Sequence, residues 1–275
     1  MMFFSQSGPF ALDSPGNPDW ILFGIPFDST SSFNTGSRFG PDSIREASYH
    51  LETYDYRTHI DLTEVRIRDV GNLHVTHGDP SANNEIISRA LKEITLPFIA
   101  LGGDHSISYP LVTHCNPDVC ICLDAHLDLR DEYLGEPLSH ACASMRITQV
   151  CPIHIYGFRE CSQEEYRYAR ENSIRIYAAS EMKSIEYPVD QRVYLSVDLD
   201  VLDPSVVPAV SNPVPGGLSF EDVVSTIESI LQVNTLVSMD MCELCSRYAD
   251  SSAVTAAMLL YKILALWRKC NEGKN

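Results

Sequence analysis

Three stretches of the sequence combine acidic and histidine side chains at spacings that suit metal chemistry. Alternate residues of an extended chain point to the same side, so each stretch projects its polar side chains together. The set comprises two imidazoles and four carboxylates: His105 in LGGDHS, Asp124, His126 and Asp128 in LDAHLD, and Asp198 and Asp200 in VDLD.

Each piece alone has an ordinary structural explanation. A single D-x-D after a strand is more often a turn or helix cap, and a single histidine there usually makes a structural hydrogen bond. Together, six such groups at one sheet edge would repel and desolvate one another, and two divalent cations are the simplest compensation. Carboxylates and imidazoles without an obligatory thiolate favour Mn²⁺. Two such ions about 3.5–4 Å apart activate water, which indicates hydrolysis.

The elements that must position these groups are visible as short, near-continuous apolar runs, typical of parallel strands buried on both faces. We predict strands at 20–25, 66–71, 96–102, 119–125, 153–158, 174–177, 192–200 and 235–241. Helical patterns lie between most of them, at 41–48, 81–94, 219–232 and 252–269, with Ser81 and Ser219 suited to capping. This alternation predicts an α/β fold with one mainly parallel sheet between helical layers, and ligands bind beyond the carboxyl ends of such strands.

Bulk composition limits the classes of function. The 275 residues contain no repeat or long linker, which predicts a single domain over 1–275. A formal net charge of −17 disfavours nucleic acid and suits a small cationic substrate. Nine cysteines without framework spacing indicate a reducing compartment. We expect no signal peptide, because no basic flank precedes the first apolar stretch, and no membrane span, because residues 253–267 are too short.

At these motifs the sequence resembles the arginase–agmatinase (ureohydrolase) family. GGDHS, DAHLD and SVDLDVLDP stand in the family's order, GIPFDSTSSFNTGSRFGPDSIREAS resembles the agmatinase-type N-terminal signature, and MDMCELCSRYADSSAVTA resembles the C-terminal segment. The resemblance covers nearly the whole chain. It implies a three-layer α/β/α arginase-like fold with about eight strands, two Mn²⁺ ions per chain, a cytoplasmic location, and a homotrimer or homohexamer.

The resemblance also implies how the six ligands are shared. One Mn²⁺ would be held by His105, Asp124 and Asp128 and the second by Asp124, His126, Asp198 and Asp200, with Asp124 and Asp198 bridging.

Three further roles follow from the resemblance. His140 in LSHACAS matches the family's mobile histidine, which is thought to relay protons and lies beside the substrate. Glu243 in MDMCEL matches the glutamate that anchors the guanidinium, and Asp128 would take the proton of the attacking water. The chain departs from the family where Ala141 follows His140 and where Cys245 and the next serine replace an Asn-Pro-like step. The C-x-x-C formed with Cys245 is interpreted as two reduced cysteines, because it does not open a helix.

The substrate is less constrained than the metal site. The stretch LRDEYLGEPLSH lacks the Ser/Asn-rich pattern with which arginases recognise the α-amino acid end, so arginine is disfavoured. Asp131, Glu132 and Glu136 would favour the ammonium of agmatine, whereas Arg130 would favour a carboxylate, as in guanidinobutyrate; all four equally suit a solvated loop. The N-terminal signature favours agmatine.

Agmatine would be hydrolysed to putrescine and urea, a step of polyamine biosynthesis. The alternatives are another ureohydrolase (guanidinobutyrase, aminopropylagmatine ureohydrolase, formiminoglutamase or arginase) or a non-catalytic ureohydrolase-like binding subunit. Six intact ligands argue against the last, because a decayed site would be expected to lose a carboxylate first.

Overall fold

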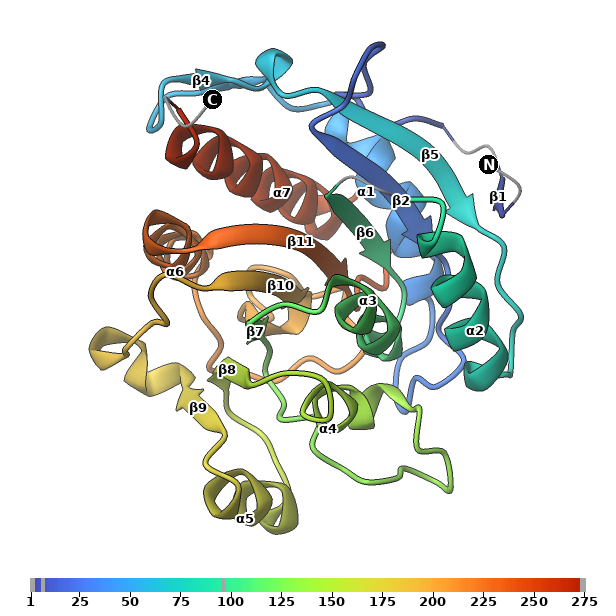
Figure 1. Ribbon diagram of the computed structural model, residues 1–275, viewed down its shortest axis with the longest axis vertical. Helices are drawn as coiled ribbons and strands as arrows, with labels where there is room; N and C mark the ends of the chain where they lie inside the picture. The colour runs from blue at the N-terminus through green and yellow to red at the C-terminus, as the bar shows by residue number, and fades with distance from the viewer. Residues whose placement is uncertain (1–2, 6–7, 95–96, 273–275) are drawn as a thin grey trace.

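The computed structural model describes residues 3–5, 8–94 and 97–272, and its centre is a nine-stranded sheet in the order β1-β5-β2-β6-β11-β10-β7-β8-β9 (Figure 1). All neighbours are parallel except the antiparallel pair β1 and β5. The strands of this sheet are β1 (Phe4–Ser5), β2 (Trp20–Ile25), β5 (Ile67–Leu73), β6 (Phe98–Gly102), β7 (Val119–Leu123), β8 (Ile153–Phe158), β9 (Arg175–Ala178), β10 (Arg192–Asp198) and β11 (Thr235–Cys242). A separate small hairpin pairs β3 (Tyr54–Asp55) with β4 (Ile60–Asp61).

The eight predicted strands are all present, with ends within two residues of the prediction. Residue 96, where one predicted strand begins, lies outside the described residues. The structure adds β1, a two-residue strand too short to leave a pattern in the sequence.

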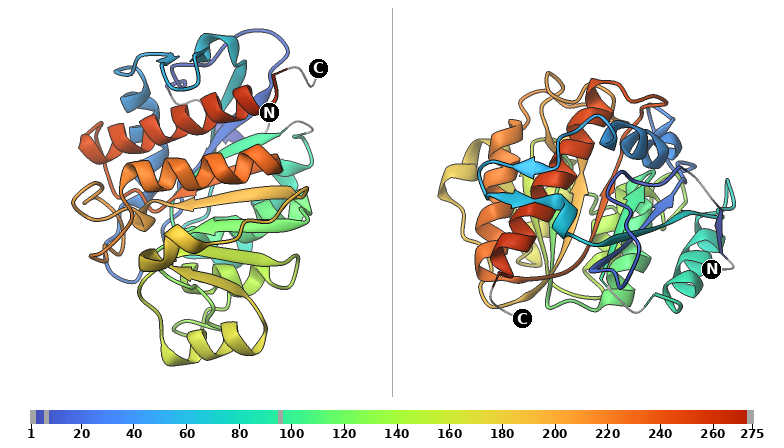
Figure 2. Two further views of the ribbon diagram at one scale, coloured as in Figure 1. Left: turned by 90° about the vertical axis from the view of Figure 1, so that its left-hand side faces the viewer. Right: turned by 90° about the horizontal axis from the view of Figure 1, so that it is seen from above.

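Helices cover both faces of the sheet, which confirms the predicted three-layer α/β/α architecture (Figure 2). Alternate side chains of one strand enter different cores: Leu22 of β2 packs in one hydrophobic cluster and Phe23 in the other. The first cluster includes residues of α1 (Gly40–Ser48), α6 (Phe220–Val233) and α7 (Ser251–Cys270). The second includes residues of α2 (Pro80–Leu91), α3 (Ser108–Cys115), α4 (Ala143–Ile147) and α5 (Gln163–Glu171).

The predicted helix caps were right in one case and wrong in the other. Ser219 caps α6 in a capping box with Asp222, as predicted. The cap of α2 is Asp79 rather than Ser81, since the Asp79 carboxylate accepts a 2.8 Å hydrogen bond from the backbone amide of Ala82. Pro80 then occupies the first turn, where its missing N–H costs nothing.

Four adjacent central strands, β6, β11, β10 and β7, deliver their carboxyl ends to the same edge of the sheet. His105 follows β6, Glu243 follows β11, Asp198 ends β10 and Asp124 follows β7. The fold therefore gathers side chains from distant stretches of sequence at one place. Within the described part of the chain, no helix is long and apolar enough to cross a membrane.

Candidate active site

His105 lies at the centre of a buried group of carboxylates. Its Nδ1 atom is 3.1 Å from Oδ2 of Asp124, 3.1 Å from Oδ2 of Asp128 and 3.3 Å from Oδ2 of Asp198. The same Nδ1 is buried and makes no hydrogen bond with the described residues. One nitrogen and three carboxylate oxygens facing one another in this way form a set of donors suited to a shared cation.

His126 forms a second group on the other side of Asp124. Its Nδ1 lies 3.0 Å from Oδ2 of Asp200 and 3.6 Å from Oδ1 of Asp124. Asp124 therefore turns one carboxylate oxygen toward each histidine, which is the arrangement of a bridging ligand. The backbone amide of Asp200 donates to Oδ1 of Asp198 at 2.9 Å and fixes that carboxylate as well.

The electrostatics of the cluster require positive charge. Burial, together with the charges of Asp200 and Asp124, raises the pKa of Asp198 well above its usual range. Burial and the charge of Asp124 raise the pKa of Asp128 to about 7. Carboxylates this crowded are costly to ionise unless cations lie among them. The donor set thus fits a pair of hard divalent ions.

The neighbouring cysteine does not change that preference. Cys122 Sγ lies 3.9 Å from Nε2 of His105, but burial raises the pKa of this thiol well above its ordinary value. This thiol approaches Nε2, the ring nitrogen that Ser196 contacts at 3.0 Å, whereas the carboxylate oxygens face Nδ1, so the donors around Nδ1 are oxygen atoms.

A buried chain of hydrogen bonds fixes the His105 ring at its other nitrogen, Nε2. Its Nε2 is 3.0 Å from Ser196 Oγ, and Ser196 donates to Oδ1 of Asp240 at 2.8 Å. The hydroxyl of Tyr194 donates to Oδ2 of the same carboxylate at 2.7 Å. Because Ser196 gives its proton to Asp240, it accepts from Nε2–H of His105 and leaves Nδ1 free as a ligand.

Asn212 plays the corresponding part for His126. Its side-chain Nδ2 lies 2.9 Å from Nε2 of His126. A ring that uses Nδ1 as a ligand carries its proton on Nε2, and an amide turned by 180° would then present its oxygen as the acceptor. We predicted neither Asn212 nor Ser196. The period of two along β10 could have revealed Ser196, which precedes Asp198 on the same side of the strand, but Asn212 lies in an irregular segment without such a signal.

Glu243 stands beside this cluster at the end of β11. It adopts a left-handed backbone conformation with φ of 69°. Oε1 accepts a 2.7 Å hydrogen bond from the backbone amide of His105, whereas the buried Oε2 has no partner among the described residues. Burial and the charge of Asp104 raise the pKa of Glu243 to about 8. A carboxyl with such a pKa is largely protonated near neutral pH before a cation binds, and a bound cation such as a guanidinium would favour its charged, accepting form.

His140 is held by the N-terminal block of the sequence. Its backbone amide donates to Thr30 Oγ1 at 2.9 Å, its Nδ1 is 3.2 Å from the same oxygen, and its Nε2 is 3.3 Å from Ser32 Oγ. Burial and the nearby histidines lower the pKa of His140 to about 4. The ring is therefore neutral near pH 7.

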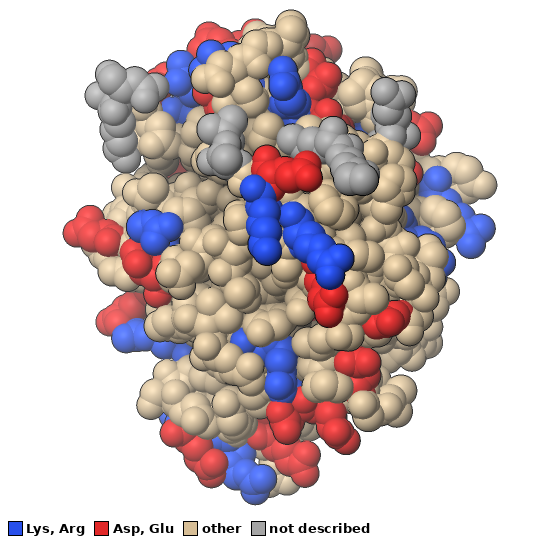
Figure 3. All heavy atoms as spheres, turned by 45° about the vertical axis from the view of Figure 1, so that its right-hand side comes forward, with Lys and Arg blue, Asp and Glu red and all other residues tan. Residues whose placement is uncertain are grey.

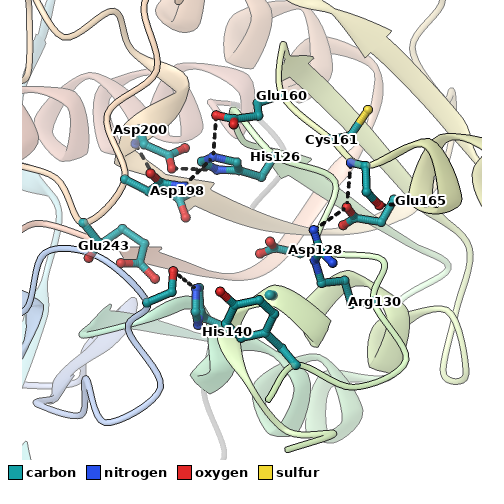
Figure 4. A pocket seen from close by; sticks show the side chains of 16 residues that line it. His126, Asp128, Arg130, His140, Glu160, Cys161, Glu165, Asp198, Asp200 and Glu243 are labelled. Atoms are coloured by element: carbon teal, nitrogen blue, oxygen red, sulfur yellow. Dashed lines mark hydrogen bonds and ion pairs between the residues drawn. The ribbon is translucent and has the colours of Figure 1, made fainter. Parts of the chain in front are cut away.

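A pocket of about 260 Å³ opens onto these groups (Figure 4). Six of the predicted site residues line it: His126, Asp128, His140, Asp198, Asp200 and Glu243. His105 and Asp124 are buried behind them. Glu160 and Glu165, which we did not predict, belong to the pocket wall because α5 and the segment before it fold over this end of the sheet.

Of the four loop residues considered for substrate recognition, only Arg130 lines this pocket. Asp131 forms an ion pair with Arg146, and Glu136 accepts a 2.8 Å hydrogen bond from the backbone amide of Leu138. Glu132 and Asp131 border a neighbouring depression instead.

Comparison with known proteins agrees with this geometry. The family model "Arginase family" matches residues 18–266. An N(1)-aminopropylagmatine ureohydrolase of Thermococcus kodakarensis is 36% identical over 265 residues, covering 92% of each chain. An agmatinase of Pyrococcus horikoshii is 34% identical, covering 90% of this chain and 92% of its own. The crystal structure of the agmatine ureohydrolase of Thermoplasma volcanium superimposes with a TM-score of 0.85 at 30% identity, over 98% of this chain and 97% of that one.

The chain therefore belongs to the arginase family. It is a hydrolase of the ureohydrolase class, a metal-dependent group of enzymes, and its His/Asp cluster has the composition of a metal site.

Proposed function

We propose that this ureohydrolase hydrolyses the guanidino group of agmatine to urea and putrescine. The observation that carries the proposal is the buried, unpartnered Oε2 of Glu243 next to the carboxylate and histidine cluster. Relatives named agmatinase and the agmatinase-type N-terminal block support agmatine as the guanidino compound.

We further propose that two Mn²⁺ ions occupy the cluster. His105, Asp124 and Asp128 would hold one, and Asp124, His126, Asp198 and Asp200 the other, with Asp124 and Asp198 shared; the crowding of buried carboxylates supports this assignment. When bound, the ions supply Lewis acidity and lower the pKa of water toward neutrality.

The side chains of the chain carry out the remaining steps. Oε2 of Glu243 accepts hydrogen bonds from the N–H groups of the guanidinium and thereby turns the guanidinium carbon toward the cluster. Asp128 takes a proton from the attacking water, and the neutral imidazole of His140 exchanges protons with solvent, so that a proton reaches the leaving amine. The C–N bond to the alkyl chain breaks, and urea and a primary amine leave.

N1-aminopropylagmatine is a second candidate substrate, favoured by the name of the relative from Thermococcus kodakarensis. The test combines metal analysis of the purified protein with urea release from agmatine, N1-aminopropylagmatine, arginine and 4-guanidinobutyrate. We expect manganese-dependent urea release that is fastest with agmatine. A preference for arginine, or an inert metal-free protein, would overturn the proposal; the second result would support a binding subunit.

We propose that residues 1–275 act as one ureohydrolase domain in the cytoplasm and assemble as a trimer or hexamer. Eight of the nine cysteines, from Cys115 to Cys245, form no disulfide among the described residues, which agrees with a reducing compartment. Light scattering of the purified protein tests the assembly.

A further inference from the structure

Two charged side chains of opposite sign stand on the wall of the active-site pocket, away from Glu243: Glu160 and Arg130 (Figure 4). The charge of Arg130 is already compensated. Its Nη2 lies 3.5 Å from Oε2 of Glu165, and its guanidinium lies 5.6 Å from the centre of the Tyr133 ring. An anionic substrate end would therefore compete with a carboxylate that is already in place.

Glu160 has only one long contact of this kind among the described residues. Its side chain is 60% exposed, and its Oε2 is 3.8 Å from Nε2 of His126, beyond hydrogen-bonding distance. Asn212 lies 2.9 Å from that same nitrogen. The carboxylate of Glu160 therefore stays exposed on this wall and makes no hydrogen bond with a described side chain, so it remains open to a cationic donor.

We propose that Glu160 is a specificity-determining residue that receives the ammonium at the far end of a guanidinoalkylamine, while Glu243 holds the guanidinium end. This inference rests on the proposed function. It makes the pocket selective for substrates with a positive charge at both ends, because Glu243 and Glu160 line the same pocket at separate places (Figure 4).

The general field of the protein is a competing explanation that the test must separate. The chain has a net charge of −17, and on the face shown in Figure 3 acidic side chains are crowded at the lower end, where α5 lies. Such a field attracts any cation. Glu164, an exposed residue in the first turn of α5 that does not line the active-site pocket, offers a matched control with the same loss of charge.

The experiment compares kcat/KM for agmatine with that for n-butylguanidine, which has the same guanidinium end and no ammonium. Glu160→Gln should lower the agmatine-to-butylguanidine ratio about tenfold, mostly through KM, and Glu164→Gln should change it less than about twofold. Metal content is measured on every preparation, so that damage near His126 is seen directly.

The outcomes are distinct. An unchanged ratio in Glu160→Gln, or an equal fall in both variants, overturns the role of Glu160 while the wild-type activity stands. A fall of both rates together with lost metal assigns Glu160 to the support of His126 and also overturns the role. A wild-type enzyme that releases urea from neither compound rejects the proposed function itself.

Discussion

The Oε1 atom of Glu243 accepts a 2.7 Å hydrogen bond from the backbone amide of His105, so the residue proposed to hold the guanidinium is fixed to the segment that carries a proposed metal ligand. The anchor uses one carboxylate oxygen and leaves the other without a partner among the described residues, in a side chain that lines the pocket. Substrate and metal positions are thereby set by the same contact between the ends of β6 and β11.

Glu243→Gln keeps an oxygen for the His105 amide but removes the negative charge. We expect kcat/KM for agmatine to fall about 100-fold, because a hydrogen bond to a charged group contributes up to about 3 kcal/mol. Metal content should stay at the wild-type level, as measured by plasma mass spectrometry. Loss of metal in this variant would mean that Glu243 supports the cluster rather than the substrate.

Asp198→Asn tests the cluster itself. The variant should lose most of its metal and nearly all urea release, since the proposed bridging carboxylate is gone. The metal-free variant should melt about 2–4 °C above metal-free wild type, because a carboxylate whose pKa is raised by burial and like charges destabilises the fold near neutral pH. A fully metallated, active Asp198→Asn protein is incompatible with the proposed site.

The sheet could be predicted because its strands are buried on both faces. A run such as residues 153–158 is bounded correctly because the apolar pattern ends where burial ends. The helices α3 and α4 were not predicted, since they are only 8 and 5 residues long and leave a weak periodic signal. The helix α5 was missed although Ser162 and Glu165 form a capping box at its start. The cap of α2 was misplaced because Asp79, Pro80 and Ser81 all favour a helix start.

The six candidate ligands could be found because they stand in dense motifs on a few strand ends. The residues that orient or surround these ligands could not be predicted. Asn212, Glu160 and Thr30 are single residues from separate loops, and only the folded chain brings them to the pocket or to His140. Predicting them needs the three-dimensional path of the loops, which local pattern does not contain.

Asn212 provides a test of the residues that orient the proposed metal ligands. Asn212→Ala removes the amide that faces Nε2 of His126, and we expect metal affinity about tenfold weaker, in the range found for partners of metal-bound histidines. Asn212→Asp, which keeps an acceptor, should retain affinity near wild type. Calorimetric titration of the metal-free protein with Mn²⁺ measures both. Equal affinities in the wild type and the alanine variant would show that Asn212 does not orient the ring.

Far from the pocket, Lys262 of α7 donates a 2.6 Å hydrogen bond to Oδ2 of Asp55, which ends β3. Burial alone would raise the pKa of Asp55, but the hydrogen bonds from Lys262 and Thr58 and the lysine charge outweigh it and hold the pKa below its ordinary value. A lowered folded-state pKa means that the pair stabilises the fold fully above pH of about 4 and progressively less as the pH falls through the lower, folded value.

Asp55→Asn should therefore lower the free energy of unfolding at pH 7 by about 2–3 kcal/mol, because it weakens hydrogen bonds to a largely buried cation. The difference between wild type and variant should shrink below about pH 4, where the unfolded carboxyl of the wild type becomes protonated. Urea unfolding at several pH values measures this. Asp61 ends β4, is less buried than Asp55 and accepts hydrogen bonds from the backbone amide and the hydroxyl of Thr63. Asp61→Asn is the matched control and should change stability by less than half as much. A difference between wild type and Asp55→Asn that is the same at pH 3 and pH 7 would show that the charge of Asp55 contributes nothing.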